Sequence, residues 1–354
     1  MNPRAVRRST ALAAQLGLVD RLRSTPADRE LARDIDAGLD RVEADLAEQV
    51  RFADEIADTT TSYLLKAGGK RVRPVLTLLT AHLGRGITDE VIAAATAIEV
   101  THLGSLYHDD VMDDADKRRG VPSAQTVWGN SVAILAGDLL FARASQLMAE
   151  LGERAIRLQA ATFERLVLGQ LHETVGAPDG EDPVQHYLQV LADKTGSLIA
   201  AAARSGVIFS GAPDEFEQPI VEYGERVGVA FQIIDDVIDL SPQPRDTGKV
   251  PGTDLRAGVV TLPLLRLREL ALTDAASADL LDRLERDVIG VPEGDDPVAD
   301  ALIAELRAHP ATEYTIAEAH RWARDAVSSL DPLPQGQVTK ALTRFADTVV
   351  ERSN

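Results

Sequence analysis

Two copies of one acidic pattern contain the residues of this chain best suited to chemistry. Asp109-Asp110-Val-Met-Asp113 and Asp235-Asp236-Val-Ile-Asp239 both read Asp-Asp-x-x-Asp. Positions i and i+4 share a helix face, so each copy stacks two carboxylates that repel by about 0.2–0.5 kcal/mol. Mg²⁺ suits such pairs, because it binds one or two carboxylates together with substrate phosphate oxygens. The pattern predicts two metal-binding faces that, opposed across a cavity, would hold metal ions around a diphosphate.

Apolar residues surround both copies, which argues against a fully solvated acidic helix face. Leu103, Leu106 and Val111 flank the first copy, and Ile234 and Val237 lie within or beside the second. A helix exposed on all sides would not carry these side chains. Metal binding is therefore favoured over a merely solvated charge run.

Positive charges cluster near the first copy. Lys117-Arg118-Arg119 follows it, Gly68-Gly69-Lys70-Arg71-Val-Arg73-Pro74 heads an earlier helix, and His102 lies two turns before Asp109. Arginine grips phosphate with a planar fork, and lysine acts as a point charge. An isolated basic triplet is usually a solvated helix end, and a lone histidine is usually a core residue. Beside a metal-binding face, we interpret them as a phosphate site.

The segment Pro242–Gly258, directly after the second copy, reads as a loop with Arg245, Lys249 and Arg256 as its cations. One interpretation is a surface connection. The other is a lid that brings positive charge over a bound diphosphate and excludes water.

Composition limits the class of protein. The 354 residues are 45% hydrophobic, enough for a substantial core, and the net charge of −19 disfavours nucleic acid as a partner. The absence of cysteine excludes disulfides, thiolate metal sites and a cysteine nucleophile, and it fits a reducing compartment. We expect no transmembrane segment, because no uninterrupted apolar run approaches about 18 residues. We also expect an N-terminal tail over residues 1–25 and one catalytic domain over 26–354.

Helical periodicity dominates the chain, and βαβ alternation, G-x-G-x-x-G and a P-loop are all missing from the sequence. We predict an all-α fold, a single-domain helical bundle around a central cavity. Helices are expected at about 25–58, 60–82, 88–115, 122–150, 153–175, 184–209, 214–240, 261–271, 276–289, 296–308, 311–329 and 335–352.

Taken together, these motifs resemble those of the trans-isoprenyl diphosphate synthases of the polyprenyl synthetase family. The resemblance covers roughly residues 30–350, in the expected order. The matching residues are Gly68-Gly69-Lys70-Arg71-x-Arg73-Pro74, His102, Asp109-Asp110-x-x-Asp113, Arg118-Arg119-Gly120, Gly137-Asp138, Asp193-Lys194-Thr195, Gly228-x-Ala-Phe231-Gln232-x-x-Asp235-Asp236-x-x-Asp239, Gly248-Lys249-x-x-Gly252-x-Asp254-Leu255 and Thr261-Leu262-Pro263. Val259 departs from the pattern, because many members have lysine there.

The resemblance implies an isoprenoid-synthase-type bundle in which three Mg²⁺ ions grip the diphosphate of an allylic substrate. Asp109, Asp113 and Asp235 would ligate the ions, supported by Asp110 and Asp239, and Asp236 is counted with the catalytic residues. The remaining roles concern the two diphosphates. Those holding the allylic diphosphate would be Arg118, Lys194, Lys249, Gln232 and Thr195; those holding isopentenyl diphosphate would be Lys70, Arg73, His102 and Arg119.

The implied reaction adds a five-carbon unit. Loss of diphosphate from the allylic substrate gives a carbocation, the double bond of isopentenyl diphosphate attacks it, and a proton is lost. The product is an all-trans polyprenyl diphosphate. The resemblance also implies a homodimer, and we expect a cytoplasmic location.

Small residues precede Asp109 on its helix and suggest a long product. Gly104 and Ser105 lie one turn back and Thr101 two turns back, and each turn rises about 5.4 Å. In the family, small residues here accompany longer chains, so Gly104→Phe or Ser105→Phe should shorten the product. The competing interpretation is that these residues merely permit close helix packing.

Three other functions stay open at this point. A short-chain synthase making geranyl to geranylgeranyl diphosphate is the strongest alternative. A terpene cyclase would ionise one diphosphate and would not need the isopentenyl site. A non-catalytic partner subunit would tend to have lost the acidic motifs, and both are intact in this sequence.

Overall fold

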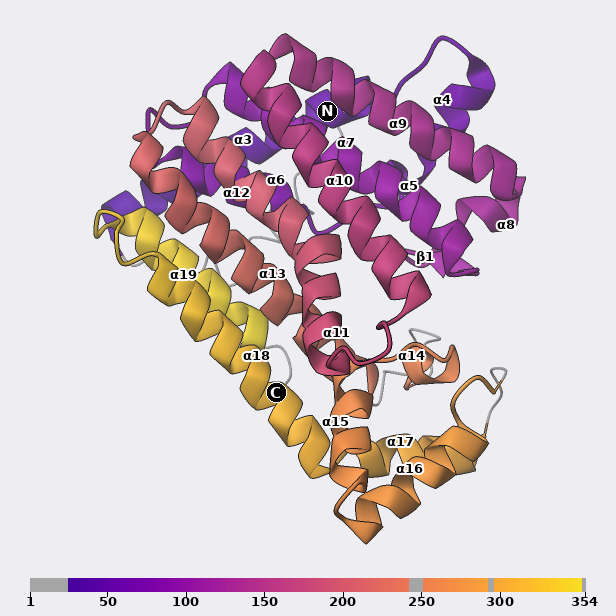
Figure 1. Ribbon diagram of the computed structural model, residues 1–354. Coiled ribbons are helices and arrows are strands. Elements are labelled where there is room, and N and C mark those ends of the chain that lie inside the picture. The colour runs from indigo at the N-terminus through magenta and orange to yellow at the C-terminus, as the bar shows by residue number, and fades with distance from the viewer. Residues whose placement is uncertain (1–24, 242–250, 292–295, 352–354) are drawn as a thin grey trace. The chain divides into compact units, whose positions relative to one another are not determined.

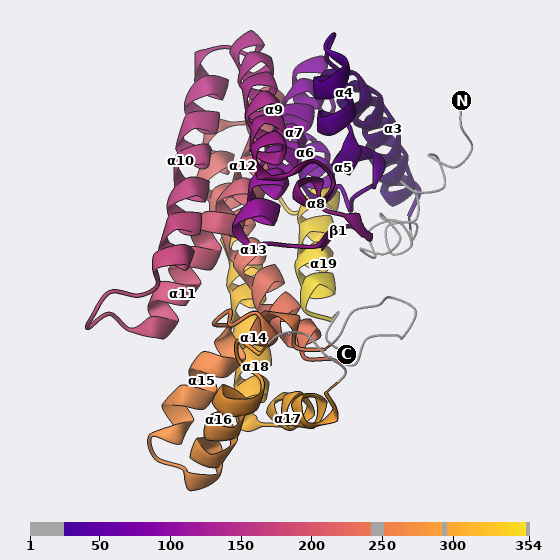
Figure 2. The ribbon, with the colours of Figure 1, turned by 90° about the vertical axis from the view of Figure 1, so that its right-hand side faces the viewer.

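The structure, a computed structural model, describes residues 25–241, 251–291 and 296–351. The fold of this part of the chain is all-α, as predicted, with one small hairpin of β1 (Lys117–Arg118) and β2 (Val121–Pro122). The helices fall into two compact units, each assembled from separated stretches of sequence (Figures 1 and 2). Whether they act as one domain around a cavity stays a prediction. The tail at 1–24 and Lys249 lie outside the described residues.

The first unit contains residues up to 164, 197–224 and 329–345. Its central helix is α7 (Asp89–Met112), which packs against five of its neighbours (Figure 2). The unit comprises α3 (Pro26–Gln49), α4 (Glu55–Thr61), α5 (Tyr63–Lys66), α6 (Val72–Ala81), α7, the hairpin, α8 (Ala124–Trp128), α9 (Asn130–Glu150), α12 (Ser197–Phe209), η2 (Asp214–Phe216), and the adjoining parts of α10 (Glu153–Val175), α13 (Glu217–Asp239) and α19 (Gln337–Glu351).

Small residues allow the close packing around α7 and α6. A Cβ on Gly104 of α7 would lie 3.2 Å from the carbonyl oxygen of Gly137 in α9, and a Cβ on Gly137 would lie 3.1 Å from that of Gly104. A similar approach of α6 and α12 needs Gly206, and the Thr77 and Thr80 hydroxyls donate across it to carbonyls of α12. These contacts fix the helix that ends in the first acidic motif.

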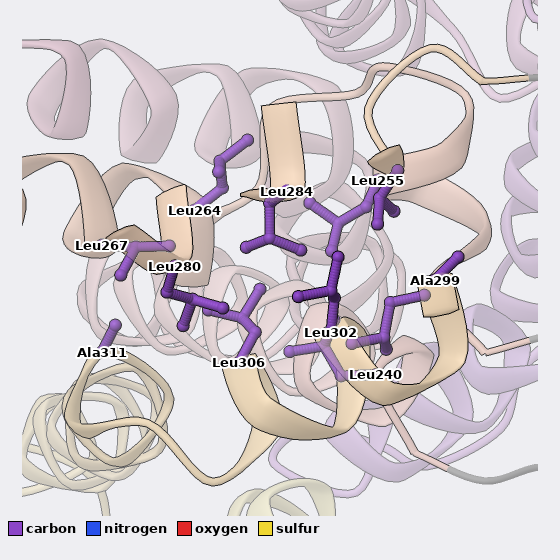
Figure 3. Close-up of a cluster of buried hydrophobic side chains, with 12 residues drawn as sticks. Leu240, Leu255, Leu264, Leu267, Leu280, Leu284, Ala299, Leu302, Leu306 and Ala311 are labelled. Atoms are coloured by element: carbon purple, nitrogen blue, oxygen red, sulfur yellow. The ribbon is translucent and has the colours of Figure 1, made fainter. Parts of the chain in front are cut away.

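The second unit contains residues 165–196, 225–328 and 346–351 of the described chain. A buried cluster of leucines, isoleucine, valine and alanine joins its helices, including Leu240 at the end of α13 and Leu255 in α14 (Figure 3). The unit comprises the remainders of α10, α13 and α19, with α11 (Pro183–Leu191), the π-helical turn η1 (Ala192–Gly196), α14 (Thr253–Arg256), α15 (Leu262–Ala271), α16 (Ala275–Asp287), α17 (Pro297–Arg307) and α18 (Pro310–Ser329).

Helix boundaries follow the expected signals where a cap is present. Thr25 and Asp28 form a reciprocal capping box at the start of α3, and the Thr88 hydroxyl caps α7. The expected helices over 25–58, 60–82, 122–150 and 184–209 are each interrupted in the structure. Three of the breaks fall at the loop between α3 and α4, at the glycine pair before α6, and at Gly129, whose φ is 83°.

Helix α9 is the one candidate for a membrane span among the described helices. It is 21 residues long, with a mean hydropathy of 1.4 over its most apolar stretch, of which 39% is buried. Asp138 and Arg143 interrupt its apolar residues, so the helix contains no unbroken apolar run of that length. Core helices of soluble proteins have the same length and composition, and the expected absence of a transmembrane segment stays a prediction.

Candidate functional site

The first acidic motif occupies the carboxyl end of α7. Asp113 is the C-cap, and its backbone N–H donates to the Asp109 carbonyl at 2.8 Å. Asp113 is exposed, Asp109 is partly exposed and Asp110 is buried. A helix carboxyl terminus carries partial negative charge, so carboxylates there are unfavourable unless a cation compensates. The two outer carboxylates therefore favour a nearby cation, and metal binding at this face stays a prediction.

The buried middle residue of this motif contacts arginine. Arg118 Nε of the hairpin donates to Asp110 Oδ1 at 2.5 Å, and burial raises the Asp110 pKa. The other carboxylate oxygen has no hydrogen-bond partner among the described residues. In the structure Asp110 thus supports Arg118, and its predicted support of a metal ion stays a prediction.

Arg119 occupies the two-residue turn of the hairpin in the left-handed region. Its φ is 55°, and that of the following Gly120 is 79°. A non-glycine residue with this conformation costs roughly 1 kcal/mol or more. The turn directs the Arg119 guanidinium to the Leu64 carbonyl, at 2.9 Å, and to the Gly68 carbonyl. The turn therefore brings a partly buried cation to the glycine pair that precedes α6.

The positive charges of Arg71, Arg73, Arg118 and Arg119 all act on His102 of α7. Burial lowers the pKa of Arg73 to about 10, although the negative charge of Glu99 acts to raise it. Burial and then the positive charges of Arg73 and Arg119 hold the pKa of His102 well below its usual range. A bound anion would relieve the mutual repulsion of these cations, and the predicted phosphate site here stays a prediction. Lys70 lies exposed next to this cluster in sequence.

Arg71 lies at the start of α6 and pairs with two carboxylates. It caps α6 with a φ of 50° and is 7% exposed. Its guanidinium pairs with Glu43 at 2.5 Å and with Glu99 at 3.2 Å. Glu99 is a lone buried acid three residues before His102 on an apolar helix. That isolation is visible in the sequence, although Glu99 was not among the predicted site residues.

The second acidic motif ends α13 in the same way. Asp235 and Asp239 are partly exposed. The Asp239 carbonyl accepts from Gly252 N–H at 2.8 Å, and its carboxylate accepts from Asp254 N–H at 3.1 Å. The segment around Gly252 is thereby held to the end of α13.

Asp236, in contrast, points into the second unit. It is 3% exposed, and its carboxylate accepts from the Tyr187 hydroxyl at 2.5 Å and the Leu262 N–H at 3.3 Å. Burial raises the pKa of Asp236 well above its usual range and does the same to Tyr187. Asp236 joins α11, α13 and the start of α15. No sequence signal pointed to Tyr187.

The predicted allylic ligands Lys194 and Thr195 lie on the π-helical turn η1. Lys194 pairs with Glu173 of α10, and the Thr195 hydroxyl donates to the Gln232 side chain at 3.4 Å. The structure thus brings Lys194, Thr195 and Gln232 to one region of the second unit. Glu173 was not singled out from sequence.

Residues 251–258 of the expected lid are described, and Arg256 is the cation among them. Arg256 is 5% exposed and pairs with Asp300 at 2.8 Å, so its charge is neutralised within the second unit. Counting Arg256 among lid cations was therefore wrong, because a solvent-facing loop was assumed where α14 packs. Val259, at the position where many relatives have lysine, is exposed.

The positions expected to set product length differ from one another. Ser105 and Thr101 are buried on one face of α7, and their hydroxyls donate to carbonyls of their own helix at 2.9 Å. Gly104 instead faces α9, where a Cβ would meet the Phe141 ring at 3.2 Å. For Gly104 the close-packing interpretation describes the structure, so Gly104→Phe would disturb packing and is replaced as a test by Ser105→Phe.

Metal ligands are available as carboxylate pairs. Over the described ranges, no group of three histidine, aspartate or glutamate side chains forms a ready-made ion site. A pair at each helix end fits Mg²⁺, which takes few protein ligands and completes its shell with phosphate oxygens and water. The mutual placement of the two pairs stays a prediction.

Comparisons with known proteins agree on the kind of protein. The family model described as polyprenyl synthetase matches residues 54–288. A nonaprenyl diphosphate synthase of Mycobacterium tuberculosis is 43% identical over 92% of this chain and 95% of its own length. A decaprenyl diphosphate synthase structure from Rhodobacter capsulatus superposes with a TM-score of 0.79 and 32% identity, covering 92% of this chain and 99% of that one. A geranylgeranyl pyrophosphate synthase from Corynebacterium glutamicum, complexed with calcium and isoprenyl diphosphate, gives 0.78 and 38%, covering 93% and 98%.

Proposed function

The chain belongs to the polyprenyl synthetase family, and from that premise we propose the assignment of its residues to the reaction. It is a prenyltransferase that condenses isopentenyl diphosphate with an allylic diphosphate to make a polyprenyl diphosphate. The observation that carries the assignment is the group of arginines next to α7: Arg119 of the hairpin donates to the Gly68 carbonyl, and Arg71 at the start of α6 pairs with Glu99 of α7. An enzyme that only ionised one diphosphate would not need a second anion site near the first acidic motif.

The divalent cation is proposed to be Mg²⁺, in three copies, held by Asp109, Asp113 and Asp235 with Asp239 in support. When bound, it would neutralise charge on the departing diphosphate. The related Corynebacterium glutamicum synthase was crystallised with calcium and isoprenyl diphosphate, which supports a divalent ion here. The carboxylate pairs at the two helix ends are the ligands such an ion requires.

We assign one set of cationic side chains to each of the two diphosphates. Arg118, oriented by Asp110, would contact the allylic diphosphate from the first unit. Lys194 would exchange its pairing with Glu173 for the same diphosphate, with Thr195 and Gln232 beside it. Arg73, Arg119 and Lys70 would hold isopentenyl diphosphate, and neutral His102 would donate a hydrogen bond without adding charge. These contacts place the attacking double bond, which is the entropic part of catalysis.

One assay tests this function directly. Labelled isopentenyl diphosphate is incubated with Mg²⁺ and, separately, with dimethylallyl, geranyl, farnesyl and geranylgeranyl diphosphates, and products are sized by chromatography. We expect polyprenyl products that require both substrates. Release of hydrocarbon from an allylic diphosphate alone would assign the chain to the cyclases, and no turnover under any condition would favour the non-catalytic subunit.

We propose a long-chain product. The nonaprenyl relative supports this, as do buried Ser105 and Thr101, whose hydroxyls are satisfied within their own helix and leave an apolar face. The short-chain alternative is supported by the likeness to the geranylgeranyl synthase. Ser105→Phe should shorten the product by one or more units relative to wild type. A product ladder unchanged by Ser105→Phe would contradict the assignment of this face to the growing tail.

We propose a homodimer that uses the outer face of α9. Leu135 is 60% exposed and Ile134 40% exposed on this helix, although its composition is that of a core helix. A second copy would cover these side chains. Leu135→Glu should shift the mass measured by light scattering from dimer to monomer, while Glu150→Gln at the end of the same helix should not.

We further propose a cytoplasmic location, supported by the lack of cysteine and testable by cell fractionation.

A further inference from the structure

The π-helical turn η1 presents the two proposed allylic ligands Lys194 and Thr195. A π-turn is rare and intrinsically poor in geometry, and such turns often occur at functional sites. A turn of this kind keeps its shape only when surrounding contacts hold it. The contacts that hold η1 therefore bear on where its side chains lie.

Three residues on one face of α10 contact η1. Arg165, Gly169 and Glu173 are four residues apart, so they form a stripe along the helix. Arg165 Nε donates to Asp193 Oδ1 at 2.7 Å, and Glu173 pairs with Lys194. Gly169 allows the turn to approach, because a Cβ there would lie 2.5 Å from the Lys194 backbone nitrogen.

Arg165 also reaches a third element. Its Nη1 donates to Glu225 Oε2 of α13 at 2.7 Å, so one guanidinium bridges η1 and the helix that carries the second acidic motif. Asp193 is 14% exposed in its side chain and also accepts from Gln189 at 2.8 Å. A guanidinium that bonds two carboxylates through different nitrogens is directional, unlike a solvated surface pair.

We infer that Arg165 is a positioning residue for prenyl transfer: through Asp193 it fixes the π-turn so that Lys194 and Thr195 meet the allylic diphosphate. The inference rests on the proposed function of those two side chains. Arg165 itself touches no substrate in this scheme. It matters because a small displacement of a binding group is costly to the reaction.

The test compares the KM for the allylic substrate with the KM for isopentenyl diphosphate. Arg165→Gln removes the bridging charge but keeps a polar side chain. We expect the KM for farnesyl diphosphate to rise by about tenfold to a hundredfold, with the KM for isopentenyl diphosphate within about twofold of wild type. The matched control is Arg154→Gln, which removes an arginine that pairs with Asp214 and Glu217 from the same helix, away from η1. Both constants should stay near wild type in the control.

Two further variants separate positioning from loss of stability. Arg165→Lys keeps one charge and should recover part of the farnesyl diphosphate KM. Asp193→Ala removes the acceptor of the Arg165 Nε bond while leaving the pair of Arg165 with Glu225, and it should reproduce the rise in the farnesyl diphosphate KM even if Arg165→Gln fails to fold. An unchanged farnesyl diphosphate KM in folded Asp193→Ala, or an equal rise in the KM values of both substrates, would overturn the inference. A wild-type protein without condensation activity would instead overturn the proposed function.

Discussion

The two Asp-Asp-x-x-Asp segments have the same sequence pattern, but their second aspartates bond to different kinds of partner. At the end of α7, buried Asp110 pairs with the guanidinium of Arg118. At the end of α13, buried Asp236 accepts from a phenol, that of Tyr187, and from the Leu262 backbone N–H. The first partner is itself a proposed substrate ligand, and the other two are neutral groups of the interior.

The difference indicates that one pattern serves two structural purposes. In each copy the first and last aspartates share a helix face at i and i+4 and stay at least partly exposed. The middle aspartate, directly after the first, is buried. In the first unit the inward carboxylate pairs with Arg118, the cation that we propose contacts the substrate. In the second unit it fastens three helices together. Changes at the two positions should therefore affect different properties.

The largest expected effect is on the stability of the second unit. Asp236→Ala leaves the Tyr187 hydroxyl and the Leu262 N–H buried without an acceptor, which should lower the free energy of unfolding by about 2–4 kcal/mol. Urea denaturation followed by circular dichroism measures this. A loss under about 1 kcal/mol would mean that Asp236 does not fasten the unit.

Asp110→Asn should act on activity instead. The amide can still accept from Arg118 but lacks the charge that orients it, so the KM for the allylic diphosphate should rise about tenfold. The free energy of unfolding should change by less than about 1 kcal/mol, because the other carboxylate oxygen has no partner within the described chain. If Asp110→Asn instead unfolded the protein with normal KM, the comparison would be broken.

The first unit should also show a dependence on pH. Burial and the charges of Arg73 and Arg119 lower the pKa of His102 below its ordinary value of 6.5, so the folded chain resists protonation there. Stability from this residue is present above about pH 6.5 and is lost as pH falls toward the folded pKa. The advantage of wild type over His102→Gln should shrink by about 1 kcal/mol between pH 7.5 and 5.5. A difference independent of pH would contradict this.

The smallest expected effect sharpens the account of Asp236. Tyr187→Phe removes one donor but leaves the Leu262 N–H bond, so we expect a loss of about 1 kcal/mol in unfolding free energy and unchanged KM values. In the double variant with Asp236→Ala the two losses should not add, because they remove the same hydrogen bond. Additive losses would show that the two side chains stabilise the protein independently.

The sequence was informative where a residue's role follows from local spacing. The i, i+4 pairs and the helix over 88–115 were predicted from the chain, and α7 confirms the helix. The basic stretches and His102 were assigned to phosphate from their residue types, and that role stays a prediction. The family assignment followed from these motifs and was confirmed by the comparisons.

What the sequence did not reveal depends on contacts between distant segments. Tyr187 gives no local sign that it meets Asp236, and Arg165 looks like any helical arginine until η1 packs against it. Gly104 and Ser105 are equally small neighbours, yet one faces α9 and the other lies on the face with Thr101. The π-turn itself has no simple sequence signature, because its extra residue is stabilised by α10.

The central claim is that the outer carboxylates of both motifs act together on one diphosphate, and alanine substitution measures it most directly. Condensation of labelled isopentenyl diphosphate with farnesyl diphosphate is compared among wild type, Asp109→Ala and Asp235→Ala at saturating Mg²⁺. We predict that each variant stays folded and loses about 10²–10³-fold in kcat. Near-normal turnover by either folded variant would contradict the account.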